Sequence, residues 1–483
     1  MVFNSIFFIF CFLPVFMLIY YLVPGKLRNL LLFLGSLIFY AWGEPVYVIL
    51  MLFSSIFNYY MGTELERLYY DDRKQKINLI FSIIINLAVL VFFKYYGFLL
   101  NTIGGIIGIH IPHPELSLPI GLSFYTFRNL SYLFDIYLSK VSAQRNFLTF
   151  AVYSTMFPYT SAGPIVRYTD IETQLKQRTI NISKFGIGAE LFVKGLAKKV
   201  LLADNLSVLY SSICGHPQMS VFTSWLGILA YTMQLYFDFS GYSDMAIGLG
   251  KMLGFDFNKN FDYPYISTSV SEFWRRWHIS LGSWFRDYIY IPLGGNRVST
   301  LKHIRNILVV WALTGLWHGA SWNFVVWGLL NSIIMLVSQE LKPLYEKADN
   351  RLGYRKLKYY KVFEIIRTTA IVCCLQMLDY YRDIAEAFRM FFSMFTSVNY
   401  VAVFTKGMWS IGLSAADYIV LFAGVVIMFA VSLLERKCPV RDRLAKKNYI
   451  IRYTVFLVIF LLIAVFGIYG TGYESSQFIY NQF

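Results

Sequence analysis

Charged residues are scarce in this chain of 483 residues, because aspartate, glutamate, lysine and arginine together make up only 15% of it. In a soluble domain, about a quarter of the residues are charged. Charge is absent altogether from residues 1–23, 77–93 and 453–473. About 20 apolar residues cross the hydrocarbon core of a bilayer as a helix. The scarcity therefore excludes a soluble globular protein and indicates a membrane protein.

Cysteine is also rare, and the motifs that hold metals are missing. The five cysteines form no C-x-x-C pair, and the spacing H-x-x-x-H does not occur. Such spacings mark zinc sites and redox centres, and many paired cysteines mark a disulfide framework. We therefore expect no metal site and no tightly bound cofactor.

The charge that is present has a strong positive excess, with a net charge of +15. Basic residues gather in short loops between apolar segments, as the positive-inside rule predicts for cytoplasmic loops. This explains the charge without a nucleic-acid partner.

Residues 1–23 have no basic start and no small-residue cleavage site before Pro24. We therefore expect a retained span rather than a signal peptide, and both chain termini outside the cytoplasm.

The apolar runs predict an all-α polytopic membrane protein with about 10–12 crossings. Backbone groups in lipid must be satisfied within their own segment, which excludes open strands. Residues 147–164 are expected to enter the membrane and turn back, and residues 255–305 to form amphipathic interfacial helices. We treat 1–483 as one domain, with the motif-bearing core at 118–339 and an extracytoplasmic tail at 470–483.

A histidine in an apolar context is the first candidate site. Residues 307–338 are expected to form two helices that break after His318, with Trp317 and Asn323 nearby as lining or structural residues. Ionisable groups inside a membrane are expensive and usually functional. A neutral imidazole can take a proton from a hydroxyl and return it, so His318 is a candidate general base. A hydrogen-bonded core histidine among packing aromatics explains the same pattern.

A dense block of aromatic and basic residues is the second candidate site. Within residues 271–297, Arg275, Arg276 and Arg286 surround His278. Arginine binds phosphates through paired hydrogen bonds. These side chains are therefore candidates to hold an anionic donor, with His278 at the inner end of the site. An interfacial belt of aromatic residues with snorkelling arginines would look much the same.

Two aspartates, Asp238 and Asp244, stand in an otherwise uncharged apolar run. We expect them to form structural ion pairs, with the arginines of residues 271–297 as candidate partners. The alternatives are ion binding or a protonation that is coupled to transport.

The chain carries a set of segments that occur together in a known family. Between Pro119 and Gly328 it reads, in order, PIGLSFYTFRNLSYLFDIY, AGPIVRY, GLAKKVLLADN, YFDFSGYSDMAIGLG, SEFWRRWHISLGSWFRDYIYIPLGGNR and LTGLWHGASWNFVVWG. These segments resemble the membrane-bound O-acyltransferases, and among them the branch of the alginate O-acetyltransferase membrane subunit. The long WRRWHIS…PLGGNR block is much more specific than a short motif.

The resemblance implies a bowl of helices around a tunnel that joins the two sides of a bacterial cell membrane. The essential histidine of the family falls on His318, and its second histidine falls on His278. A cytoplasmic acyl thioester, which we take as acetyl-CoA, enters from inside, and the acceptor works from outside. Relatives that modify exported polysaccharides act with a separate extracytoplasmic partner that resembles SGNH hydrolases. We therefore expect such a partner here, besides membrane lipid.

The last six residues, FIYNQF, resemble an F-x-Y-x-x-F ending in relatives of this system, where the tyrosine is proposed to relay the acyl group. The resemblance places that role on Tyr480, and the alternative is a disordered polar end.

D-alanyl transfer toward teichoic acid stays open, although that branch usually has asparagine at the position of His278. A transporter or flippase would use Asp238 and Asp244, but no inverted repeat is visible. A non-catalytic scaffold in wall synthesis is the third alternative.

Overall fold

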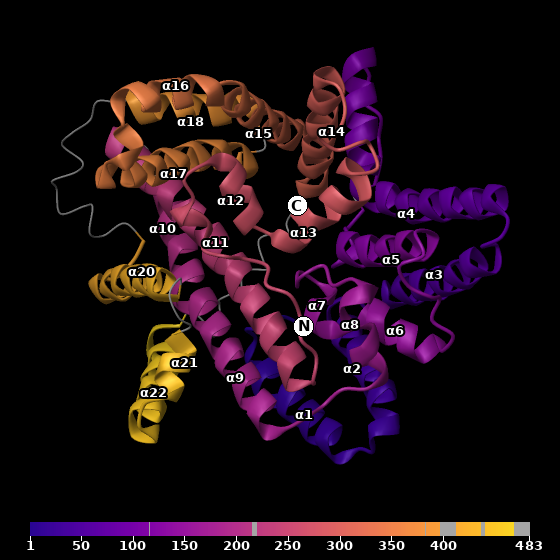
Figure 1. The fold of residues 1–483 in the computed structure, drawn as a ribbon. Coiled ribbons are helices and arrows are strands. Elements are labelled where there is room, and N and C mark those ends of the chain that lie inside the picture. Colours follow the sequence, from indigo (N-terminus) through magenta and orange to yellow (C-terminus); the bar gives the residue numbers. More distant parts are fainter. Residues whose placement is uncertain (115, 215–219, 382, 397–411, 436–439, 468–483) are drawn as a thin grey trace.

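The computed structural model describes residues 1–483 apart from 115, 215–219, 382, 397–411, 436–439 and 468–483 (Figure 1). Every regular element in the part that it describes is helical. The α-helices are α1 (Leu13–Leu22), α2 (Arg28–Gly43), α3 (Val48–Arg67), α4 (Asp72–Ile107), α5 (Leu122–Tyr137), α6 (Phe147–Thr155), α7 (Phe157–Thr160), α8 (Tyr168–Lys176), α9 (Ile182–Ala197), α10 (Asp204–Cys214), α11 (Val221–Met252), α12 (Val270–Arg276), α13 (Ile279–Phe285), α14 (Thr300–His318), α15 (Trp322–Glu340), α16 (Lys342–Leu352), α17 (Lys358–Tyr380), α18 (Ile384–Thr396), α20 (Ala415–Glu435), α21 (Val440–Ala445) and α22 (Tyr449–Phe466).

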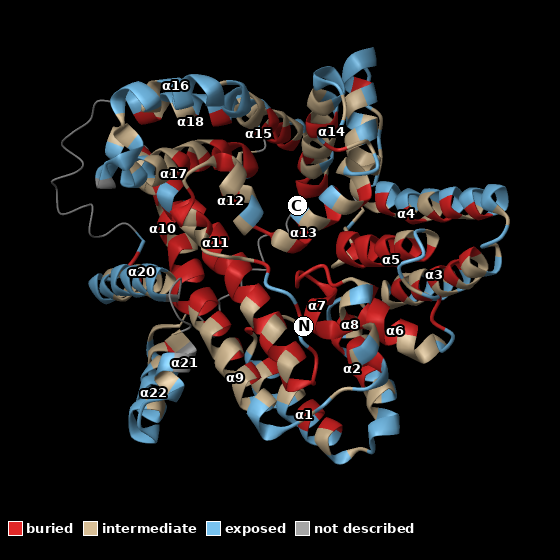
Figure 2. Ribbon diagram, viewed as in Figure 1, coloured by how far each residue is buried: buried red, intermediate tan, exposed pale blue. Residues whose placement is uncertain are grey.

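Five of the described helices, α3, α4, α15, α20 and α22, are long and apolar enough to cross a membrane. Most side chains of α20 and α22 are exposed although they are apolar, for example Phe422, Ile427 and Leu457 (Figure 2). A continuous apolar surface of this kind is expected where helices face lipid. The structure confirms an all-α polytopic membrane protein, while the expected number of crossings stays a prediction.

A pair of long helices, α9 and α11, runs through the centre of the molecule (Figure 1). Glycines on both helices allow their backbones to come close together. A Cβ atom on Gly188 would lie 2.5 Å from the carbonyl oxygen of Gly248, and one on Gly195 would lie 2.4 Å from that of Gly241. Small residues at facing positions are the usual means by which membrane helices pack tightly.

Buried ion pairs join the end of α9 to α11. The chain continues from α9 through a π-helical turn, Lys198–Ala203. The Nζ atom of Lys199 lies 2.9 Å from Oδ1 of Asp238, and that of Lys198 lies 2.8 Å from Oδ2 of Asp244. Both aspartates therefore pair with lysines of this turn and not with the arginines of the block 271–297.

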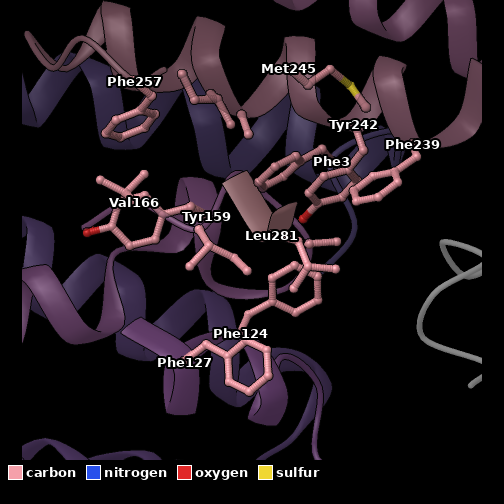
Figure 3. Close-up of a cluster of buried hydrophobic side chains, with 14 of the residues drawn as sticks. Phe3, Phe124, Phe127, Tyr159, Val166, Phe239, Tyr242, Met245, Phe257 and Leu281 are labelled. Atoms are coloured by element: carbon pink, nitrogen blue, oxygen red, sulfur yellow. The ribbon is translucent and has the colours of Figure 1, made fainter. Parts of the chain in front are cut away.

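Aromatic side chains fill the space beside α11. Phe239 and Tyr242 project from this helix toward Phe3, whose ring stacks on that of Tyr242 at a centroid distance of 4.7 Å (Figure 3). Phe124 of α5 and Leu281 of α13 belong to the same cluster. The cluster holds α5 and α13 against α11, next to the candidate site.

The segment that is expected to turn back within the membrane forms two short, largely buried helices, α6 and α7. The nine residues of α6 rise about 14 Å, which is less than half of a hydrocarbon core of about 30 Å. Arg128 of α5 closes the turn between them. Its guanidinium donates to the carbonyl oxygens of Ser154 at 2.9 Å and Tyr159 at 2.8 Å, which satisfies carbonyl groups near the helix ends.

Candidate functional site: two histidines between three cavities

The helix that carries His318 ends where the sequence predicts. α14 ends at His318, the backbone is extended at Gly319, and α15 begins at Trp322. A Cβ atom on Gly319 would lie 2.1 Å from the ring of Phe324, so this position has no room for a side chain. A Cβ atom on Gly315 would lie 2.2 Å from the carbonyl oxygen of Phe324. The two helices therefore form a tight hairpin with His318 at its break.

Two residues of α4 complete the end of α14. The last four carbonyl groups of a helix have no partner within that helix. The Tyr95 hydroxyl donates to the carbonyl oxygen of Leu316 at 2.6 Å, and the Lys94 ammonium donates to that of Trp317. A cation at a helix C-terminus is also favoured by the helix dipole. An apolar span thus brings one lysine to the end of the helix that carries His318.

His318 is buried, and its imidazole lies beside a buried carboxylate. Its Nδ1 atom is 3.4 Å from Oδ1 of Asp379, and the hydroxyl of Tyr231 donates to Oδ2 of Asp379 at 3.1 Å. The ring of Trp327 packs against the imidazole at a centroid distance of 4.4 Å. A carboxylate that faces Nδ1 favours the tautomer with hydrogen on Nδ1, so that the lone pair is on Nε2. This arrangement suits His318 to act as a general base.

Sequence reasoning did not identify Asp379. This residue follows the uncharged run 368–378 near the end of α17, and the rule for ionisable residues in membrane segments would have singled it out. The side-chain amide of Asn323 on α15 donates to the carbonyl oxygen of Leu378 at 2.7 Å. Asn323 therefore fixes the last turn of α17, which presents Asp379 to His318.

His278 lies close to His318, with the ring of Trp317 beside both side chains. The block 255–305, expected to be interfacial, contains two seven-residue helices, α12 and α13, that bury part of their surface in the body. His278 precedes α13 with a positive φ of 43°, and it is buried. The ring of Trp317 is 5.4 Å from that of His278 and 5.1 Å from that of His318, by centroid distances. Both candidate histidines thus contact one tryptophan.

Three cavities follow one another at these residues. The arginine-side cavity, of about 450 Å³, is lined by both His278 and His318 and by Arg275 and Arg286. The narrow cavity, of about 30 Å³, is lined by His318 and by Lys94. The α4-side cavity, of about 730 Å³, is lined by Lys94 and by other residues of α4, of the α4–α5 loop and of the break after α14. His318 therefore lines both the arginine-side and the narrow cavity, and Lys94 lines both the narrow and the α4-side cavity.

The arginines that we expected to hold a donor differ in their surroundings. Arg276 lies 2.9 Å from Glu272 and 3.4 Å from Asp262, and it is not among the described residues that line the arginine-side cavity. Arg286 lines that cavity and contacts Asp287 at 2.7 Å. Burial raises the pKa of the Asp287 carboxyl, but hydrogen bonds from Arg286 and a second arginine lower it by more, so that this pKa lies below its usual value. Only two of the three arginines are thus placed to meet a ligand.

The remaining candidate residues are placed as follows. Trp317 lines the narrow cavity. Asp238 and Asp244 lie in their lysine ion pairs, and neither is among the described residues that line the three cavities. Tyr480 and the tail 470–483 lie outside the described residues, so the relay stays a prediction.

Comparison with known proteins agrees with the resemblance and identifies the family. The model of the membrane-bound O-acyltransferase (MBOAT) family matches residues 40–378. The probable alginate O-acetylase AlgI of Azotobacter vinelandii is 40% identical over 400 residues, which cover 82% of this chain and 78% of that protein. The peptidoglycan O-acetyltransferase of Helicobacter pylori is 36% identical over 372 residues, or 70% of each chain. The teichoic acid D-alanyltransferase of Bacillus subtilis is 29% identical over 246 residues, which cover 47% of this chain and 60% of that protein. The chain is a multi-pass membrane protein and an O-acyltransferase, and it belongs to the membrane-bound O-acyltransferase family.

Proposed function

We propose that this enzyme moves an acetyl group from cytoplasmic acetyl-CoA to a hydroxyl on the outer side of the membrane, for the modification of an exported polysaccharide. The observation that carries the proposal is the position of His318, between a cavity lined by arginines and the cavities that lead to α4. The similarity to proteins named as alginate and peptidoglycan O-acetylating enzymes supports both the acetyl group and the polysaccharide.

The arginine-side cavity fits an acyl-CoA. Coenzyme A has phosphates at one end and the thioester at the end of a long arm, and arginine binds phosphate through charge-assisted hydrogen bonds. Arg275 and Arg286 line the cavity together with both histidines, so the phosphates and the thioester have separate partners. Gln339, near the end of α15, lines the same cavity, and the basic residues of 342–361 follow it. By the positive-inside rule this side faces the cytoplasm.

The α4-side cavity fits a hydroxyl-bearing acceptor. Its lining includes the polar side chains of Asn101, Thr102, His113 and Asp383. The loop 108–121, which contributes His113, has no lysine or arginine, as an extracytoplasmic loop should. An acceptor that enters from this side meets the narrow cavity of about 30 Å³ before it reaches His318, so its approach requires the side chains that line this cavity to move apart.

The chemistry needs no group beyond the donor, the acceptor and the histidine. His318 takes the proton of the acceptor hydroxyl while the hydroxyl oxygen attacks the carbonyl carbon of the thioester. A carbon–oxygen bond forms, the carbon–sulfur bond breaks, and the proton passes from His318 to the departing sulfur. The acetyl ester leaves on the α4 side and the thiol of coenzyme A on the arginine side, so the histidine returns to its starting state.

The first acceptor that we propose is the hydroxyl of Tyr480. An extracytoplasmic partner that resembles SGNH hydrolases then moves the acetyl group from this tyrosine to the polysaccharide. Such a relay would let one buried histidine serve a polymer that is too large to enter the α4-side cavity of about 730 Å³.

The test is to supply membranes with acetyl-CoA that is labelled in its acetyl group and to locate the label by mass spectrometry, in the wild type and in His318→Ala. We expect label on the peptide with Tyr480 in the wild type only. Label that reaches the polymer through His318 but never appears on Tyr480 would remove the relay and keep the enzyme. Transfer from a D-alanyl carrier protein without transfer from acetyl-CoA would contradict the proposal and establish the D-alanyl alternative.

A further inference from the structure

We infer that Asn260 is a positioning residue that locks His278, a lining residue of the arginine-side cavity, in the one tautomer that has a bare Nε2 atom. This inference rests on the proposed function for its consequence in catalysis, but the lock itself follows from hydrogen bonds alone. Asn260 lies between α11 and α12, and sequence reasoning did not identify it.

The oxygen of the Asn260 side chain identifies the hydrogen on His278. Oδ1 of Asn260 accepts the backbone N–H of Ser280 at 3.2 Å and the hydroxyl of Ser280 at 2.9 Å. A backbone N–H can only donate, so the atom that it meets must be the oxygen of the amide. Nδ1 of His278 lies 3.0 Å from the same oxygen. Nδ1 must therefore carry the hydrogen, and the neutral ring has its lone pair on Nε2.

The amide itself is held in place from both sides. Its Nδ2 atom donates to the hydroxyl of Ser243 on α11 at 3.1 Å. The backbone carbonyl of Asn260 accepts the N–H of Ile279, the first residue of α13, at 2.9 Å. Asn260 thus connects α11 to the start of the helix that follows His278, and the amide has one orientation that satisfies every partner.

The backbone and the neighbouring rings hold the imidazole itself. His278 has φ of 43° and ψ of 55°, in the left-handed region that few residues other than glycine adopt. Such strain persists only where the surroundings enforce it, and it is found most often at functional sites. The ring of Phe239 packs edge-on at a centroid distance of 4.6 Å. Within the described residues, Nε2 of His278 is buried and has no hydrogen-bond partner.

The locked tautomer decides which hydrogen bond His278 can make with a ligand. A neutral imidazole with hydrogen on Nδ1 accepts at Nε2 and cannot donate to a developing oxyanion there. The arm of coenzyme A carries amide N–H groups close to the thioester, and they are donors of the required kind. The bare Nε2 is thus the atom with which His278 can accept a hydrogen bond from the donor arm and so orient the thioester, in the cavity that His318 also lines.

The experiment records 15N spectra of the full-length protein labelled with 15N-histidine, in which the spectrum of His278→Gln identifies the signals of His278. We expect a protonated Nδ1 and a bare Nε2 in the wild type, and a mixture of tautomers in Asn260→Ala. The turnover rate of Asn260→Ala should fall by about 10–100-fold, the range found when a residue that orients a metal-bound histidine is lost. Asn260→Asp keeps an acceptor at Oδ1 and should restore both the single tautomer and most of the rate.

The control is Ser243→Ala, which removes the other hydrogen bond of the same amide but leaves Oδ1 in place. It should keep the tautomer of the wild type, whereas a merely structural role of Asn260 predicts that Ser243→Ala and Asn260→Ala behave alike. An unchanged His278 spectrum in Asn260→Ala, or a protonated Nε2 in the wild type, would overturn the inference. If acetyl-CoA is not the donor, neither the wild type nor any variant transfers acetyl, but the spectra still report the tautomer of His278. A failure of the proposed function can therefore be told apart from a failure of the inference about Asn260.

Discussion

Replacing Asp379 by asparagine tests the geometry around His318 most sharply. The carboxylate faces Nδ1 of His318 at 3.4 Å and is held by the hydroxyl of Tyr231 at 3.1 Å. Asparagine has the same shape, so the fold should survive the change. Its amide can turn an N–H toward Nδ1, which favours the tautomer with hydrogen on Nε2. His318 would then have no lone pair to take the proton of the acceptor.

The size of the loss follows from what a general base contributes. Proton transfer by a positioned side chain accelerates a reaction by about 10²–10⁴-fold. We expect Asp379→Asn to lower kcat by about 100-fold or more, which corresponds to about 2.7 kcal/mol in the activation barrier. The KM for acetyl-CoA should stay the same, because Asp379 is not among the described residues that line the arginine-side cavity.

The assay follows the free thiol of coenzyme A that purified enzyme releases, with size-exclusion elution and thermal unfolding as checks of the fold. Asp379→Glu keeps the carboxylate and should recover part of the rate. Tyr231→Phe removes only the hydroxyl that donates to the carboxylate. It should lower kcat by less than about tenfold, as expected for the loss of one hydrogen bond. A folded Asp379→Asn enzyme with kcat within about threefold of the wild type would refute this role.

Three further predictions concern the donor site, the hairpin and the buried ion pairs. Arg275→Ala should raise the KM for acetyl-CoA by about tenfold, the loss of one charge-assisted hydrogen bond. Arg276→Ala, whose side chain is bound to acidic residues, should change that KM by less than about twofold, and equal effects would contradict the assignment. Gly319→Ala should destabilise the fold by about 1–3 kcal/mol and lower activity, because its Cβ would lie 2.1 Å from the Phe324 ring; an unchanged melting temperature and rate would show that the ring can move. Lys199→Met leaves two buried aspartates without their shared cation. It should lower the free energy of unfolding, measured by heat or denaturant, by about 3–5 kcal/mol. An unchanged free energy of unfolding would mean that these pairs do not hold α9 to α11.

The sequence was sufficient where the signal is local. The break after His318 was predicted from Gly319 and the residues beside it, and α14 ends there. The membrane class followed from uncharged runs of the right length, and α4 and α22 are among the helices that bear this out. The prolines and glycine of residues 147–164 indicated an interrupted segment, and the structure has two short helices there, α6 and α7; that this segment turns back within the membrane stays a prediction.

The sequence was not sufficient where residues distant in the chain meet. Asp379 and Asn260 carry no local motif. Only the packing of α17 against α15, and the contact of the segment between α11 and α12 with the start of α13, bring them to the two histidines. The same limit applies to Asp238, whose partner proved to be Lys199 rather than an arginine. Hydrophobic periodicity shows that a face is buried, but it does not show which charged side chain the neighbouring helix presents.

The central claim is that His318 passes an acetyl group from the cytoplasmic side of the membrane to the outer side. The most direct measurement compares membrane vesicles of the two orientations, from cells with the wild type or with His318→Ala, after labelled acetyl-CoA is added to the outside. Acetyl-CoA does not cross the bilayer, so the account predicts label in protein or polymer only in inverted vesicles with the wild type, at sites that an added esterase cannot reach. Equal labelling in both orientations, or labelling with His318→Ala, would contradict it.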